Sequence, residues 1–127
     1  MTNEEIRDFI KNAITEEPVM LFMKGSPEEP RCGFSGRVVS ILDALGTDYA
    51  ALDILPDPRI RQELSAISNW PTIPQLFVGG ELVGGADIAI EMFESGELAQ
   101  LLGVEQPQLE AEPAPAPSQP APIQIEN

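Results

Sequence analysis

The single cysteine of the chain, Cys32, is the side chain best suited to chemistry. It follows a loop broken by Gly and Pro and precedes a segment, 33–45, in which apolar residues recur at helical spacing. The pattern predicts a thiol at a helix N-terminus, where unpaired N–H groups and the helix dipole favour the thiolate. Three cations near it in the sequence are expected to lower the pKa of the thiol further: Lys24, Arg31 and Arg37. The alternative is a buried free cysteine that acts as a small hydrophobe.

The elements that must position Cys32 follow from apolar periodicity and from turn residues. Thr2 and Glu5 form a capping box before the first helix, and the all-apolar run 19–23 is typical of a central strand buried on both faces. The expected helices cover 3–16 and 33–45 and begin at Asp57 and at Asp87, with a last helical turn over 98–102. The expected strands cover 19–23, 49–54, 75–78 and 81–83.

The order of these elements predicts the fold class. Two strands joined by a helix are expected to be parallel with a right-handed crossover, whereas the glycine pair between the last two strands predicts an antiparallel hairpin. A mixed four-stranded sheet flanked by helices on both faces satisfies both constraints. The sequence therefore predicts an α/β protein.

The composition divides the 127 residues into one domain and an appendage. Residues 1–105 are enough for a single hydrophobic core. Residues 106–127 form an acidic tail rich in Pro and Ala, without aromatic residues or periodicity. Such a segment buries too little apolar surface to offset the entropy lost on ordering, so we expect it to be disordered.

The composition also argues against several functions. One cysteine and no histidine exclude an intramolecular disulfide, an all-thiolate metal site within one chain, and the usual zinc and general-base sites. A net charge of −14 argues against nucleic acid as a partner. No segment resembles a signal peptide or a membrane span. We therefore expect a cytoplasmic location, or an organelle matrix if a presequence has been removed.

The basic residues are unevenly distributed. All seven lie at or before Arg61, and five of them fall between Lys24 and Arg61. One interpretation is a solvated acidic surface with scattered positive charges. The other is a small positive patch around Cys32, which would suit a small anionic ligand.

Four motifs occur in order along residues 3–103. They are Phe22-Met23-Lys24-Gly25, Cys32-Gly33-Phe34-Ser35, Trp70-Pro71-Thr72-Ile73-Pro74-Gln75, and Gly84-Gly85 followed by Asp87. This set resembles the monothiol glutaredoxins of CGFS type, which have a thioredoxin-like fold. The CGFS motif alone would be a weak signal, whereas four motifs at the expected spacings are a strong one.

The resemblance implies a glutathione site beside Cys32. In the family the proline at the position of Pro74 is cis and faces the cysteine, so we predict a cis Ile73-Pro74 bond, although most X-Pro bonds are trans. The backbone of Ile73, in the stretch that begins at Thr72, would then pair with an extended thiol peptide as a strand does.

The resemblance also implies contacts with the two ends of glutathione. The backbone at Gly85 allows close approach, N–H groups at Ala86 and Asp87 would hold the α-carboxylate, and the Asp87 carboxylate would hold the amine. Alanine at position 86 replaces a cysteine or serine of many relatives but keeps the backbone N–H. Lys24 and Arg61 would bind the glycine carboxylate.

Simpler interpretations of these residues remain open. Asp87 would serve as a plain helix N-cap, and Lys24 and Arg61 as solvated surface cations. We interpret Trp70 as a packing residue that supports its loop more than as a ligand contact, and Phe34 as partly exposed at the site rather than in the core. Two further cations are interpreted as solvated: Arg37 and Arg59.

Ser35 stands where a C-x-x-C motif has its second cysteine, and a serine cannot resolve a mixed disulfide. Any redox cycle would need external glutathione, so efficient dithiol chemistry is not expected. A low-pKa thiolate is also a metal ligand, and a [2Fe–2S] cluster usually takes four thiolates. The resemblance implies a homodimer that bridges a labile cluster through two Cys32 thiolates and two glutathiones.

These expectations lead to one function and two alternatives. The first is a glutathione-dependent [2Fe–2S] cluster carrier that delivers clusters to apo iron–sulfur proteins and, as relatives do, pairs with a BolA-like protein. The second is a glutathione-dependent thiol–disulfide oxidoreductase that uses one cysteine. The third is an interaction module in which the cluster regulates a partner.

Overall fold

The computed structural model of the protein describes residues 1–105, so the disorder predicted for the tail, 106–127, lies outside the described residues. The helices are α1 (Asn3–Glu16), α2 (Gly33–Leu45), α3 (Pro58–Ser68), α4 (Ala86–Ser95) and α5 (Glu97–Leu102). The strands are β1 (Val19–Met23), β2 (Ala50–Asp53), β3 (Gln75–Val78) and β4 (Glu81–Gly84). The predicted order of elements is confirmed.

The four strands form one mixed sheet in the order β2-β1-β3-β4. Strand β1 pairs in parallel with β2 and antiparallel with β3, with Leu21 opposite Ala51 on one side and Leu76 on the other. Strands β3 and β4 form the predicted antiparallel hairpin. Because β1 and β3 are adjacent and antiparallel, the loop that follows β1 and the loop that precedes β3 meet at the same end of the sheet.

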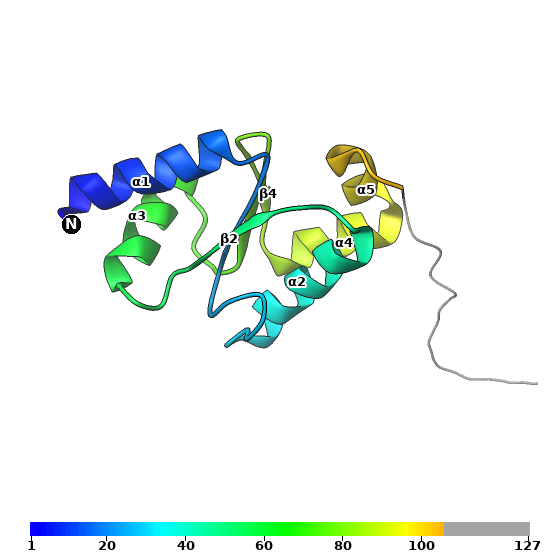
Figure 1. The fold of residues 1–127 in the computed structure, drawn as a ribbon, viewed down its shortest axis with the longest axis horizontal. Coiled ribbons are helices and arrows are strands. Elements are labelled where there is room, and N and C mark those ends of the chain that lie inside the picture. Colours follow the sequence, from blue (N-terminus) through cyan, green and yellow to red (C-terminus); the bar gives the residue numbers. More distant parts are fainter. Residues whose placement is uncertain (106–127) are drawn as a thin grey trace, which may run out of the picture.

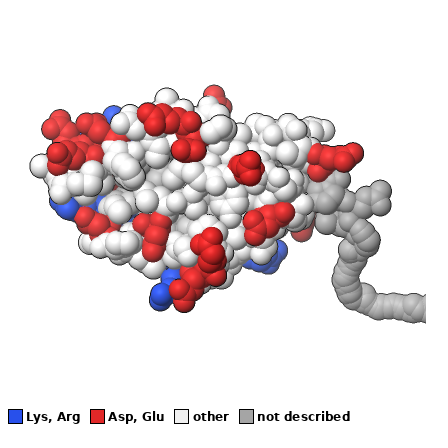
Figure 2. Space-filling model, in the orientation of Figure 1, with Lys and Arg blue, Asp and Glu red and all other residues white. Residues whose placement is uncertain are grey.

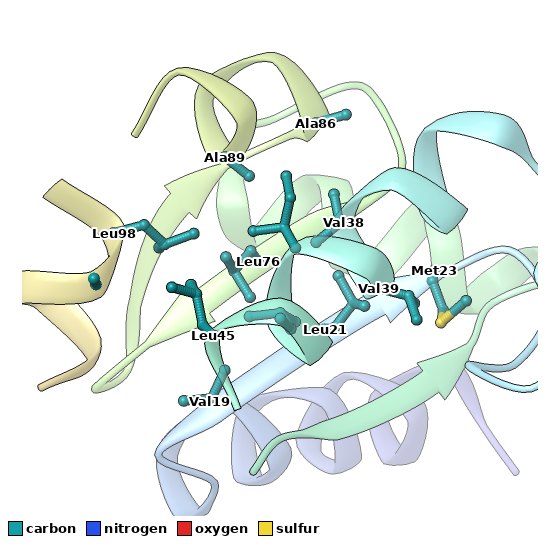
Figure 3. Close-up of a cluster of buried hydrophobic side chains, with 13 residues drawn as sticks. Val19, Leu21, Met23, Val38, Val39, Leu45, Leu76, Ala86, Ala89 and Leu98 are labelled. Carbon is teal, nitrogen blue, oxygen red and sulfur yellow. The ribbon is translucent and has the colours of Figure 1, made fainter. Parts of the chain in front are cut away.

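Helices cover both faces of the sheet, with α1 and α3 on one face and α2, α4 and α5 on the other (Figure 1). This arrangement explains the all-apolar β1, because successive side chains of a strand point to opposite faces. Leu21 and Met23 belong to the core under α2 and α4 (Figure 3), whereas Phe22 packs under α1 and α3. There the Phe22 ring meets Phe77 edge to face, with ring centroids 5.7 Å apart.

Several predicted boundaries are wrong by one or two residues; β4 also extends to Gly84, and α5 begins at Glu97. Strand β2 covers 50–53 rather than 49–54, since an edge strand pairs only along the part of β1 that lies opposite it. Helix α4 is capped by the backbone of Gly85 and not by Asp87, which lies within the first helical turn. A carboxylate in the first turn still interacts favourably with the helix dipole, so sequence alone does not separate the two positions.

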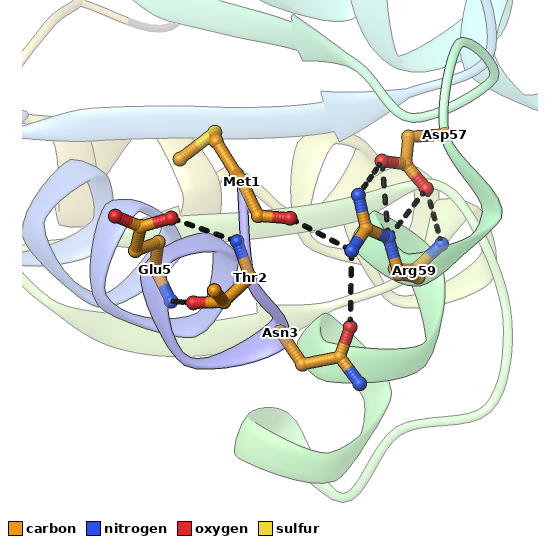
Figure 4. A network of polar contacts seen from close by, with 6 residues as sticks. All are labelled: Met1, Thr2, Asn3, Glu5, Asp57 and Arg59. Carbon is orange, nitrogen blue, oxygen red and sulfur yellow. Dashed lines mark hydrogen bonds and ion pairs between the residues drawn. The ribbon is translucent and has the colours of Figure 1, made fainter.

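Arg59 was interpreted as a solvated cation, and this interpretation is wrong. Its guanidinium pairs with both carboxylate oxygens of Asp57 and donates to the carbonyl of Met1 (2.8 Å) and to Oδ1 of Asn3 (3.3 Å). Figure 4 shows this network beside the capping box of Thr2. Arg59 thus joins the N-termini of α1 and α3, which are far apart in the sequence.

Candidate functional site

Cys32 lies at the N-cap of α2 in extended backbone geometry and is half-buried. The backbone N–H of Ser35 has the largest effect on the Cys32 thiol and lowers its pKa. This N–H does not form a capping hydrogen bond of ordinary geometry with the thiol. Burial opposes this shift, whereas the N–H of Phe34 and the charge of Lys24 reinforce it. The thiol is therefore stabilised as a thiolate at a helix N-terminus, and the alternative of a buried, inert cysteine is wrong.

Of the three cations expected to act on the thiol, Lys24 is the one whose charge lowers its pKa. Arg31 lies 3.7 Å from the carboxylate of Glu29, and Arg37 lines a separate groove between α2 and α4. The predicted positive patch is thus reduced to Lys24 and one further cation, Arg61. On the face shown in Figure 2, acidic side chains are widely spread and basic ones form a few separate spots.

The backbone around Lys24 is held by three bonds to distant parts of the chain. Its N–H donates to the hydroxyl of Ser35 at 3.1 Å, and its carbonyl accepts from the N–H of Arg31 at 2.8 Å. The next N–H, that of Gly25, donates to Oδ1 of Asp53 at 2.9 Å. Ser35 is fully buried, so its hydroxyl is a structural partner of Lys24 as well as a replacement for a second cysteine. No pattern in the sequence indicates this bond, because it depends on how α2 packs against the end of β1.

A cleft of about 290 Å³ lies next to the thiol, because Lys24 and Phe34 line it and both act on the pKa of Cys32, although Cys32 itself is not a lining residue. It brings together all nine residues predicted to bind glutathione, in addition to Trp70. The lining residues are Lys24, Phe34, Arg61, Trp70, Thr72, Ile73, Pro74, Gly85, Ala86 and Asp87. Phe34 is 61% exposed, so the alternative of a core residue is wrong. The structure therefore collects these residues from five separate segments, whereas their roles toward a ligand stay predictions.

One wall of the cleft is the loop from Trp70 to Pro74, which contains the predicted cis Ile73-Pro74 bond. The side chain of Gln75 donates to the carbonyls of Trp70 (3.0 Å) and Thr72 (3.1 Å), and Arg61 donates to the carbonyl of Pro71 (3.3 Å). Side chains therefore hold three successive carbonyls of this loop.

A second wall is the N-terminus of α4, which adjoins this loop. A Cβ on Gly85 would lie 3.2 Å from Nε1 of Trp70 and 3.3 Å from the carbonyl oxygen of Pro74. A side chain at position 85 would therefore crowd the contact between the two walls. Gly84 does not line the cleft; its φ is +144°, and a Cβ there would lie 2.8 Å from Ile88. Trp70 thus both packs and lines the cleft, which the sequence did not show.

Two further observations limit the chemistry of the chain. Within residues 1–105, the Cys, Asp and Glu side chains nowhere form a group of three that could hold a metal ion. No helix in this part of the chain combines the length and apolar character needed to cross a membrane. Any metal held at Cys32 would therefore need ligands from outside the described chain.

Comparison with known proteins agrees with the fold and the motifs. A family model described as Glutaredoxin matches residues 19–83. The chain is 56% identical over 93 residues to glutaredoxin 4 of Escherichia coli K12, a match that covers 73% of this chain and 81% of that protein. It is 55% identical over 97 residues to monothiol glutaredoxin-S17 of Arabidopsis thaliana; this match covers 76% of the chain but only 20% of the plant protein.

The solved structures give the same result. The solution structure of reduced poplar apo GrxS14 superposes with a TM-score of 0.72 at 39% identity, over 81% of this chain and 95% of that one. The fold is thus that of a thioredoxin-like glutaredoxin domain with one thiol at its helix N-terminus. The chain belongs to the glutaredoxin family and is a monothiol member of it.

Proposed function

We propose that this protein is a glutathione-dependent carrier of [2Fe–2S] clusters, in which the cluster is cargo shared by two copies of the chain. The observation that carries the proposal is a single stabilised thiolate beside a cleft lined by two cations. The chain has no second thiol with which to run a dithiol cycle. Ligation of a soft metal is a chemistry that remains open to such a thiolate.

The cleft has the chemistry that glutathione would need. Glutathione carries two carboxylates, one amine and one thiol. Lys24 and Arg61 supply positive charge for one carboxylate, and the backbone at the N-terminus of α4 supplies donors for the other. The exposed carboxylate of Asp87 supplies a partner for the amine.

The number of ligands then favours two chains. A [2Fe–2S] cluster is usually held by four thiolates, and each chain supplies one, Cys32. Two chains and two glutathiones complete the set. Because half of these ligands are small molecules that exchange with solvent, the cluster would be passed on more readily than one held by four protein cysteines.

The proposal extends to partners and location. We propose that apo iron–sulfur proteins receive the cluster and that a BolA-like protein pairs with this chain. A free thiolate and soluble glutathione suit a reducing compartment, the cytoplasm or an organelle matrix.

Anaerobic reconstitution with iron, sulfide and glutathione tests the proposal. The wild type should acquire the visible absorption of a [2Fe–2S] cluster and elute as a dimer, and both should depend on glutathione. The Cys32→Ser variant should acquire neither. Absence of a cluster in the wild type, or its full retention in Cys32→Ser, would contradict the proposal.

The half-exposed, low-pKa thiol also favours a second function, removal of glutathione from protein mixed disulfides. In that reaction the Cys32 thiolate attacks the glutathione sulfur, the protein thiolate leaves, and a second glutathione thiolate then attacks the new mixed disulfide. The products are reduced Cys32 and oxidised glutathione. High turnover by the cluster-free monomer would support this function over that of a carrier.

A further inference from the structure

Gln75, at the first position of β3, is one of two fully buried polar side chains among residues 1–105; the other is Ser35. Gln75 pairs with Phe22 across the sheet. A buried polar side chain costs free energy unless its hydrogen bonds are made. Gln75 does not line the cleft, so a ligand there would not pair with its amide. The burial of this polar side chain is instead offset by its hydrogen bonds to the surrounding loop.

Those contacts run to the loop that forms one wall of the cleft. Nε2 of Gln75 donates to the carbonyls of Trp70 and Thr72, at 3.0 and 3.1 Å. Both carbonyls must point into the protein, because their donor is fully buried. Between them, the carbonyl of Pro71 accepts from Arg61. The loop therefore keeps these three acceptors paired.

The orientation of the amide is determined by these two bonds. If the amide were flipped, Oε1 of Gln75 would face two carbonyl oxygens, and no hydrogen bond could form. In the observed orientation Oε1 has no partner within residues 1–105, and neither has the buried Nε1 of Trp70. The fold thus leaves one buried acceptor unpaired while the two carbonyls are held.

Turning these carbonyls inward matters for an anionic ligand. Free carbonyl oxygens facing the cleft would repel a carboxylate, and a loop released from Gln75 would also move Thr72, Ile73 and Pro74 relative to the thiol. We propose that Gln75 is a positioning residue, which shapes the cleft for an anionic thiol peptide by holding the Trp70–Pro74 loop. This inference rests on the proposed glutathione site and adds a residue that does not touch the ligand.

The single tryptophan of the chain provides a direct test. Trp70 lines the cleft, so its fluorescence emission reports on the loop with or without ligand. Gln75→Met keeps an unbranched side chain of similar length and removes both donors. Gln75→Asn keeps an amide that is too short to reach both carbonyls. The matched control is Gln100→Met, at an exposed position of α5.

Both Gln75 variants should remain folded, with a shifted Trp70 emission in the absence of ligand. Their glutathione dissociation constant, measured well below the unfolding temperature, should rise roughly three- to tenfold, the effect of losing hydrogen bonds that orient the site. Gln100→Met should match the wild type in both measurements.

Unchanged emission of Trp70, or an unchanged dissociation constant despite shifted emission, would overturn the proposal. Failure of both Gln75 variants to fold would also overturn it, because Gln75 would then support the whole domain rather than the cleft. If the wild type itself binds no glutathione, the proposed function fails, while the ligand-free emission still decides whether Gln75 holds the loop.

Discussion

The buried hydroxyl of Ser35 accepts a 3.1 Å hydrogen bond from the backbone N–H of Lys24. This bond joins the end of β1 to the first turn of the helix that begins at Cys32. A cysteine in place of Ser35 would supply a resolving thiol, but sulfur is a weaker acceptor than a hydroxyl oxygen. Ser35 therefore removes the possibility of a dithiol cycle within the chain. Its hydrogen bond to Lys24 also holds the backbone beside Cys32, the thiolate proposed to bind the cluster.

Ser35→Ala should raise the pKa of the Cys32 thiol, because its hydroxyl contributes to stabilising the thiolate. The rate of alkylation of the cluster-free protein, measured against pH, should then move to higher pH and be roughly three- to tenfold slower at neutral pH. Ser40→Ala, at an exposed position of the same helix, is the control. Identical profiles for Ser35→Ala and the wild type would show that the hydroxyl does not act on the thiol.

The sign of the associated stability change follows from the direction of the shift. In the folded protein the pKa of Cys32 lies below its ordinary value of 9.0. The thiolate therefore adds stability that is complete above that value and is lost as the pH falls through the folded pKa. Part of this gain should be missing in Ser35→Ala, as thermal unfolding on either side of pH 9.0 would show.

Replacing both cations of the cleft, by Lys24→Ala with Arg61→Ala, should weaken the retention of glutathione in the cluster-bound dimer. The loss should be about three- to tenfold and should shrink at high salt, since these side chains are solvent-accessible and their ion pairs are screened. Lys11→Ala with Arg37→Ala removes the same charge outside the cleft and serves as the control. Equal affinity in the two double variants would exclude Lys24 and Arg61 from the site.

Gly85→Ala should separate the walls of the cleft, because the new Cβ would lie 3.2 Å from Nε1 of Trp70. We expect a loss of stability of about 1–3 kcal/mol, as in other overpacked sites, together with weaker glutathione binding and altered Trp70 emission. In Gly36→Ala the nearest atom, Cβ of Pro30, would be 3.6 Å away, so this helix position should tolerate or favour alanine. A Gly85→Ala variant with the stability and the glutathione affinity of the wild type would contradict this prediction, because the two walls would then accommodate the added Cβ.

Arg59→Ala should lower the thermal unfolding midpoint at neutral pH, because it separates the N-termini of α1 and α3, and should leave glutathione affinity unchanged.

The Arg59 guanidinium lowers the pKa of Asp57 below its ordinary value of 3.8. The stability from this pair is therefore present above pH 3.8 and is lost as the pH falls through the folded pKa of Asp57. The difference from the wild type should accordingly shrink in acid, where only the bonds of Arg59 to Met1 and Asn3 remain. Arg37→Ala should not reproduce the effect, and an equal midpoint for Arg59→Ala and the wild type at neutral pH would contradict the role assigned to Arg59.

Much of the fold could be predicted from the sequence because its signals are local. The capping box at Thr2, the apolar β1 and the glycine pair of the hairpin each specify an element within a few residues. Helix α4 shows the limit of such signals. Asp87 is a residue type that favours the N-cap, but Gly85 takes that position, where a Cβ would lie close to Trp70 and Pro74 from a distant loop.

The sequence by itself determined the order of elements, the single thiol and the residues able to surround it, since periodicity, turn residues and motifs are encoded along the chain. Only the tertiary structure decided which cations face the thiol. Lys24 carries the same charge as three arginines but has different neighbours, since it acts on the thiol, whereas the arginines lie against carboxylates or in another groove. These arginines are Arg31, Arg37 and Arg59. It also decided that Ser35 and Gln75 hold backbone from distant segments, because a buried hydrogen bond depends on how packed elements meet.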